Sequence, residues 1–228
     1  MSQSKDSAAV EGEGNAVLYR GAAATFVDAV RSGTVLRPQL WGLADVLVAL
    51  LLSLLIPSVV VGVLLAAGAP KNGTIIILAS LISPWIGFGL WPAFATRRQG
   101  NGPRIDLGLA FTRDDLRWGI LGGAAALALG SVVALITEHF TGPFDSAAGS
   151  AISGANVPRW VVILFAILAV AGAPFMEELC FRGLTFTALA KFSEEHGWAP
   201  IPVASVVSAV LFAAVHLEPI RFPLLLTI

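Results

Sequence analysis

An apolar stretch in the last quarter of the sequence, residues 173–183, contains two adjacent carboxylates and an arginine. A charge in the hydrocarbon core of a membrane costs about 2.5 to 3.5 kcal/mol on insertion scales, so it needs a partner or a chemical role. Glu178 and Arg182 are four residues apart on one helix face, which predicts an ion pair. Glu177 points about 100° away and has no arginine of its own. Glu177 is therefore the candidate for chemistry.

His216 is the candidate partner of Glu177, because it lies near the end of the next apolar segment. If one helix continues to about residue 192, Glu177 lies roughly 22 Å from that end. His216 lies roughly 25 Å along a returning helix that begins near residue 199. An antiparallel hairpin would bring both side chains to one depth, close enough to share a water. A packed, hydrogen-bonded histidine and a functional one are both compatible with this spacing.

Pro174 lies just before the two carboxylates. It has no backbone N–H and frees a carbonyl near Val170, so a kink there could open a water-accessible cavity. The small residues at 171–173 also permit a neighbouring helix to approach closely, which ordinary packing explains equally well.

The composition indicates a membrane protein. Of 228 residues, 56% are hydrophobic and 13% are charged, and the mean hydropathy is +0.81. The apolar runs reach about 20 residues without the alternation of a β-barrel, so they predict membrane-spanning helices. The net charge of -1 makes nucleic acid an unexpected partner. A single cysteine, Cys180, excludes an internal disulfide.

The apolar segments predict an all-α, polytopic transmembrane helical bundle with five full spans and an incomplete sixth that begins after Pro219. The five are Trp41–Ala67, Thr74–Ala95, Trp118–Thr137, a helix from Trp160 past Arg182, and Pro200–Leu217. The six tryptophans fall at or near segment ends, where we expect them at the headgroup level. They are Trp41, Trp85, Trp91, Trp118, Trp160 and Trp198.

The polar residues 1–40 predict a cytoplasmic N-terminal tail, and residues 41–228 form the transmembrane domain. Eleven of the 14 Lys and Arg residues fall in the tail and the loops on one side of the membrane. The other side receives three: Lys71, Arg159 and Arg221. Because positive loops stay in the cytoplasm, we expect a multi-pass protein of the cell membrane with its N-terminus inside.

The motif Glu177-Glu178-x-x-x-Arg182, followed by Phe212-x-x-x-His216, resembles the first two motifs of a known protease family. This is the CAAX protease and bacteriocin-processing (Abi-type) family, the glutamate intramembrane proteases related to the type II CAAX prenyl endopeptidases. The flanking pattern Ala-Pro-x-x-Glu-Glu-x-x-Phe-Arg-Gly also resembles that family. The detailed resemblance covers roughly residues 160–217.

The resemblance implies an endopeptidase that cleaves a membrane-associated peptide or protein substrate within the lipid bilayer. Glu177 would activate a water, and His216 would position that water or polarise the scissile carbonyl. Glu178 and Arg182 would support the catalytic helix and orient the substrate, and Phe212 would shape the pocket wall. The family also has a third motif, His-x-x-x-Asn in a later helix. The sequence ends before it, so we expect a C-terminally truncated chain that is inactive as given, whereas the full-length protein would be active.

A metal cofactor is not expected. Carboxylates and histidines could hold a zinc ion with an open water position, and members of the family have been described as metalloproteases. The glutamate-activated water needs no metal, and the sequence offers only His216 at depth. The residues themselves leave the zinc question open.

Two other functions stay open. One is a catalytically incomplete immunity or scaffolding membrane protein that keeps the fold without turnover. The other, less favoured, is a proton-coupled transporter component, because Glu177 and His216 at one depth could pass protons. The sequence shows no internal repeat with paired broken helices, which such a transporter would favour. It does not determine the substrate or the oligomeric state.

Overall fold

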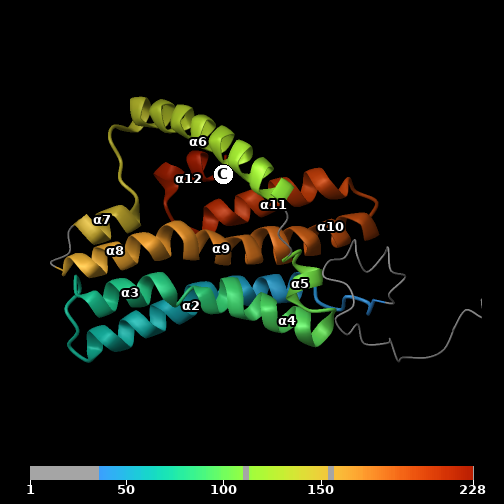
Figure 1. The fold of residues 1–228 in the computed structure, drawn as a ribbon, viewed down its shortest axis with the longest axis horizontal. Helices are drawn as coiled ribbons and strands as arrows, with labels where there is room; N and C mark the ends of the chain where they lie inside the picture. Colours follow the sequence, from blue (N-terminus) through green and yellow to red (C-terminus); the bar gives the residue numbers. More distant parts are fainter. Residues whose placement is uncertain (1–35, 110–112, 154–156, 228) are drawn as a thin grey trace, which may run out of the picture.

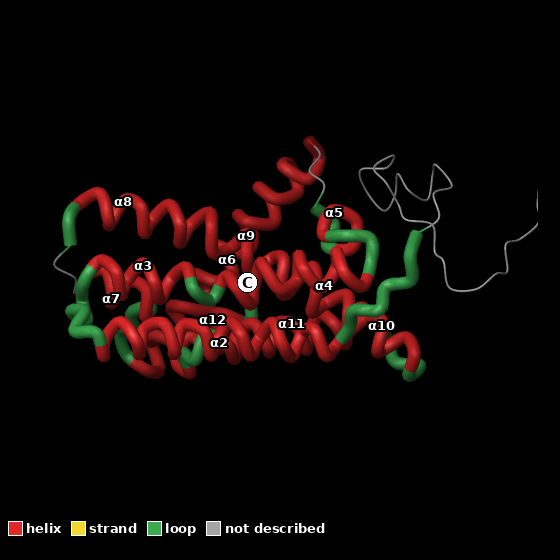
Figure 2. Tube along the Cα trace, turned by 90° about the horizontal axis from the view of Figure 1, so that it is seen from below, coloured by secondary structure: helices red, strands yellow, loops and turns green. Residues whose placement is uncertain are grey.

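The computed structural model describes residues 36–109, 113–153 and 157–227, and these ranges contain helices and no strand (Figures 1 and 2). The predicted all-α bundle is confirmed. The first 35 residues of the predicted polar tail lie outside the described part. The helical elements are α2 Leu43–Ala66, α3 Thr74–Ile82, η1 Ile86–Leu90, α4 Trp91–Gln99, α5 Pro103–Asp106, α6 Arg113–Thr141, α7 Ala147–Ser153, α8 Arg159–Ile167, η2 Leu168–Gly172, α9 Ala173–Glu177, η3 Glu178–Thr185, α10 Phe186–Glu195, α11 Pro200–Val215, η4 Pro219–Arg221 and α12 Phe222–Leu225.

Four continuous helical stretches are long and apolar enough to cross a membrane: Leu43–Ala66, Thr74–Gln99, Arg113–Thr141 and Arg159–Glu195. The last of these, called the long helix below, joins α8, η2, α9, η3 and α10. The predicted fifth span is helical, but α11 has 16 residues. At 1.5 Å per residue it measures about 24 Å, against about 30 Å for a hydrocarbon core. By length alone, α11 does not cross the whole layer.

The chain after α11 differs from the incomplete sixth span expected there. Leu217 adopts φ +54°, a left-handed conformation that breaks the helix after His216. The short 3-10 turn η4 and the single turn α12 follow, and they pack beside α11 and α6 (Figure 1). Pro219 and Pro223 account for this locally, because proline lacks the N–H that would continue a preceding helix.

The long helix runs through the middle of the molecule. In Figure 1, α2, α3 and α4 lie on one side of it, and α11, α12 and α6 lie on the other. Two glycines of η1 permit close packing on the first side. A side chain at Gly87 would meet the α2 backbone, and one at Gly89 would meet the thioether of Met176. Met176 precedes Glu177, so this contact supports the long helix directly behind the first carboxylate.

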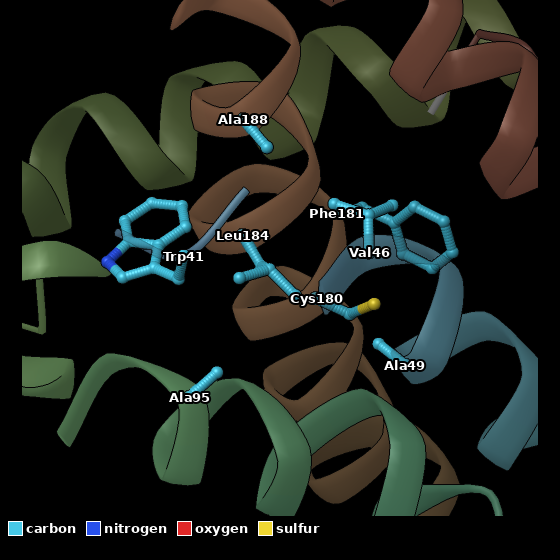
Figure 3. Close-up of a cluster of buried hydrophobic side chains, with 8 residues drawn as sticks. All are labelled: Trp41, Val46, Ala49, Ala95, Cys180, Phe181, Leu184 and Ala188. Carbon is cyan, nitrogen blue, oxygen red and sulfur yellow. The ribbon is translucent and has the colours of Figure 1, made fainter. Parts of the chain in front are cut away.

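The hydrophobic core shown in Figure 3 fills the space between the long helix and α2 and α4. It consists of Trp41, Val46, Ala49, Ala95, Cys180, Phe181, Leu184 and Ala188. Trp41 lies just before the start of α2 and is 1% exposed, so its ring packs inside the protein. Its ring is buried because its Nε1 donates a hydrogen bond to the carboxylate of Asp106, at 2.9 Å. Trp118, Trp160 and Trp198 are exposed near helix ends, as expected.

Candidate active site

Glu177 is the central residue of the 37-residue long helix Arg159–Glu195. At 1.5 Å per residue, it lies about 27 Å from either end. Irregular helix surrounds it, because the π-helical segments η2 and η3 flank α9. Pro174 contributes to this irregularity, since it cannot donate to the carbonyl four residues earlier. Such π segments are frequent at functional sites.

The structure brings Glu177 and His216 together, which confirms the predicted proximity. The Glu177 Oε1 and the His216 Nε2 are 3.9 Å apart, and about a quarter of each side chain is exposed. The two residues come from helices that pack side by side, and His216 stands where α11 ends. The shortness of α11 thus leaves the histidine at the level of the carboxylate.

The imidazole of His216 is held from behind by Phe212. The His216 Nδ1 lies 2.7 Å from the Phe212 carbonyl oxygen. Because a carbonyl can only accept, Nδ1 carries the proton and donates it, which leaves Nε2 as an acceptor in the neutral ring. The two rings also pack against each other, with centroids 4.6 Å apart. Phe212 in turn makes an edge-on contact with Phe181, with centroids 5.1 Å apart.

Glu178 and Arg182 form the predicted ion pair, with 3.2 Å between the Glu178 Oε2 and the Arg182 Nε. Both side chains are more than half exposed rather than packed into the bundle. Charges near the middle of a membrane-spanning helix are tolerated where they face a water-filled space. The pair therefore indicates that water reaches this level of the long helix.

A cavity of about 640 Å³ lies between the long helix, α11 and α12. Its wall contains both carboxylates and Arg182 beside a series of aromatic and aliphatic groups. The lining residues are Pro174, Glu177, Glu178, Phe181, Arg182, Phe186, Ser205, Ser208, Ala209, Phe212, Leu225, Leu226 and Thr227. The cavity thus combines charged groups with an apolar surface.

Sequence reasoning missed several residues of this region. Ser208 precedes His216 by two helical turns and is polar in an apolar segment, so it carried a usable signal. Nothing in the sequence indicated that residues 225–227 line the cavity, because this depends on the chain turning back after α11. Arg221 was expected in an external loop, but it is half-buried and paired with Glu218 immediately after the break in α11.

Within the part of the chain that the structure describes, the donor set around Glu177 does not fit a catalytic zinc centre. Among the residues that the structure describes, no group of three or more His, Cys, Asp or Glu side chains could hold a metal ion. Glu178 is paired with Arg182, which leaves Glu177 and His216 as two donors. Catalytic zinc sites use three protein ligands.

Part of the chain matches a known protein family. Residues 158–228 match the family described as "Type II CAAX prenyl endopeptidase Rce1-like". The matched segment contains all five predicted site residues, together with the long helix and α11. No curated protein and no solved structure is similar enough to this chain to count as a match. The resemblance predicted from the two motifs is confirmed over residues 158–228, which are similar to the type II CAAX prenyl endopeptidase Rce1-like family.

Proposed function

We propose that this protein is an intramembrane endopeptidase in which Glu177 activates a water that hydrolyses a peptide bond. The observation that carries the proposal is the 3.9 Å separation between the Glu177 Oε1 and the His216 Nε2 at the edge of a charged cavity. The family match supports a protease of the CAAX type in general terms. The roles of individual residues rest on the geometry.

The separation suits a bridging water. An ionised Glu177 and a neutral His216 present two acceptors that cannot hydrogen-bond to each other. A water about 2.8 Å from each atom would donate one hydrogen to each acceptor. Its lone pairs would then point away from both side chains, toward a substrate in the cavity.

The chemistry follows from this arrangement. Glu177 takes one proton from the water as the oxygen attacks the scissile carbonyl carbon and forms a tetrahedral intermediate. The carbon–nitrogen bond then breaks, and Glu177 passes the proton to the leaving amine. The products are a carboxylic acid and an amine, and Glu177 returns to its ionised state. His216 fixes the position of the water throughout.

The cavity suggests how a substrate would be held. Glu178 and Arg182 offer an acceptor and donors to the backbone of an extended peptide, and Phe212 supplies an apolar wall. We propose a membrane-associated peptide or protein that reaches the cavity from the lipid bilayer. We also propose that the N-terminus is cytoplasmic, because Arg97 and Arg98 lie at the end of a membrane-spanning stretch on that side.

The test uses the natively expressed protein in phospholipid vesicles with lipid-anchored, internally quenched peptides of randomised sequence. We expect cleavage by the natural protein and a loss of at least about 1000-fold in Glu177→Gln, since the amide cannot accept the proton. Glu194→Gln is the matched control, because Glu194 lies exposed at the end of the same helix. Equal cleavage by Glu177→Gln, or no cleavage by the natural protein, would overturn the proposal.

A further inference from the structure

A buried hydrogen bond joins the helix that carries His216 to the helix that carries Glu177. The Ser208 hydroxyl donates to the Phe181 carbonyl oxygen across 3.0 Å. Ser208 is 8% exposed, so water does not replace this bond readily. Phe181 lies in η3, where its carbonyl also accepts the N–H of Phe186 five residues later. Ser208 thus binds α11 to the irregular part of the long helix.

The same residues lead directly to His216. The ring of Phe181 packs against Phe212, whose ring and carbonyl hold the imidazole. Backbone and side chain of Phe181 are therefore both in contact with α11, one through Ser208 and one through Phe212. A shift of α11 along the long helix would disturb both contacts and move His216 relative to Glu177.

Besides this hydrogen bond, α11 packs against the long helix and α12 through mainly apolar side chains. The helix is short and ends at His216, and the turn that follows begins with the left-handed Leu217. The contacts along an apolar helix in a membrane have little directionality, because lipid is as apolar as the side chains. A hydrogen bond to one carbonyl does have a defined length and direction.

We propose that Ser208 is a positioning residue that fixes the register of α11 on the long helix and thereby the distance between His216 and Glu177. This inference rests on the proposed function of that pair. The Ser208 hydroxyl donates to the Phe181 carbonyl rather than to Glu177 or His216. Its effect reaches the reaction through Phe181, Phe212 and His216.

The kinetic test compares three variants with the natural protein, using the best-cleaved lipid-anchored peptide in vesicles. We expect Ser208→Ala to lower kcat at least about tenfold with little change in KM, because small displacements of catalytic groups have large effects on rate. Ser208→Thr keeps a hydroxyl that can donate to the Phe181 carbonyl, so we expect kcat within about threefold of the natural value. Ser53→Ala is the matched control.

Ser53 suits this purpose because it is 4% exposed and its hydroxyl bonds within its own helix, to the Leu50 carbonyl at 2.8 Å. We expect natural kcat and KM in that variant. A Ser208→Ala kcat equal to that of Ser53→Ala would overturn the inference. A loss of kcat that Ser208→Thr does not restore would also overturn it.

A second measurement tests the register of α11 on the long helix and does not depend on substrate cleavage. Glu177→Cys and His216→Cys are combined in a Cys180→Ala background and treated with a short bis-methanethiosulfonate cross-linker. We expect efficient cross-linking with Ser208 present and at least about threefold less with Ser208→Ala, but not with Ser53→Ala. Equal yields would overturn the inference. Unchanged cleavage by Glu177→Gln would instead count against the protease proposal and leave this measurement able to decide the role of Ser208.

Discussion

Two carboxylates in this protein stand in opposite surroundings. Asp106, at the end of α5, is 6% exposed and accepts four hydrogen bonds. Its Oδ1 receives the side-chain amides of Gln39 and Asn101, at 3.0 and 3.2 Å. Its Oδ2 receives the Trp41 Nε1 and the Asn101 backbone N–H, at 2.9 and 2.8 Å. Glu177 faces a cavity and a histidine nitrogen at 3.9 Å, beyond hydrogen-bond reach.

The difference separates a structural carboxylate from a reactive one. The four donors around Asp106 occupy its lone pairs, so the group has no capacity left for a ligand, and two of them join residues 39–41 to residue 106. Glu177 keeps lone pairs free and lies where water has room. The two carboxylates differ in whether protein donors occupy all their hydrogen-bonding capacity, and burial or charge alone does not distinguish them.

The sharpest test exchanges the acid for the amide at each position. Glu177→Gln should abolish cleavage of lipid-anchored peptides, by at least about 1000-fold, and leave thermal unfolding nearly unchanged, because the amide fits the same space. Asp106→Asn should leave cleavage per folded molecule nearly unchanged and lower the unfolding temperature. In that variant, one carboxylate oxygen is replaced by an amide N–H donor that faces other donors. Cleavage per folded molecule and the unfolding temperature are measured for both. A clearly lower unfolding temperature in Glu177→Gln would mean that Glu177 is also a structural carboxylate, which contradicts the distinction from Asp106.

Removal of the saturated carboxylate should have the largest effect on stability. Asp106→Ala leaves the buried Nε1 of Trp41 and the Asn101 backbone N–H without their acceptor, and we expect a loss of about 3 kcal/mol or more in unfolding free energy. Reversible unfolding in mixed micelles measures this change. Asp145→Ala, at an exposed position, is the control and should stay within about 0.5 kcal/mol of the natural protein.

A smaller effect is expected where the long helix reaches the Asp106 cluster. The Lys191 Nζ donates to the Trp41 carbonyl at 2.7 Å and lies 3.9 Å from the centre of the Trp41 ring. Lys191→Met keeps the aliphatic stem but removes both interactions, so we expect a loss of about 1 to 2 kcal/mol in unfolding free energy. Lys71→Met, at an exposed position, should show no such loss.

The smallest effect on stability should come from the exposed ion pair of Glu178 and Arg182. Solvent screens such pairs, so Arg182→Gln should change the unfolding free energy by less than about 1 kcal/mol. A double-mutant cycle with Glu178→Gln isolates the coupling between the two side chains. A coupling well above that value would mean that the pair is a structural element comparable to the Asp106 cluster.

Much of the site was predictable from local spacing. The ion pair followed from a separation of four residues on one helix, and the meeting of Glu177 with His216 followed from counting the rise along an antiparallel hairpin. Both depend on helix geometry, which is the same wherever a helix forms. The Asp106 cluster was not predictable, because two of its four hydrogen bonds join Gln39 and Trp41 to a residue more than 60 positions later in the chain.

The sequence by itself determined the membrane class, the helical fold, the family motifs and the residues facing each other across the hairpin, because hydropathy and helical periodicity are local properties. Only the tertiary structure decided which carboxylate is saturated, where α11 ends beside Glu177, and how residues 217–227 turn back to close the cavity. Those outcomes depend on hydrogen bonds and side-chain packing between segments distant in sequence. The role of Ser208 belongs to the same class, since its acceptor lies on another helix.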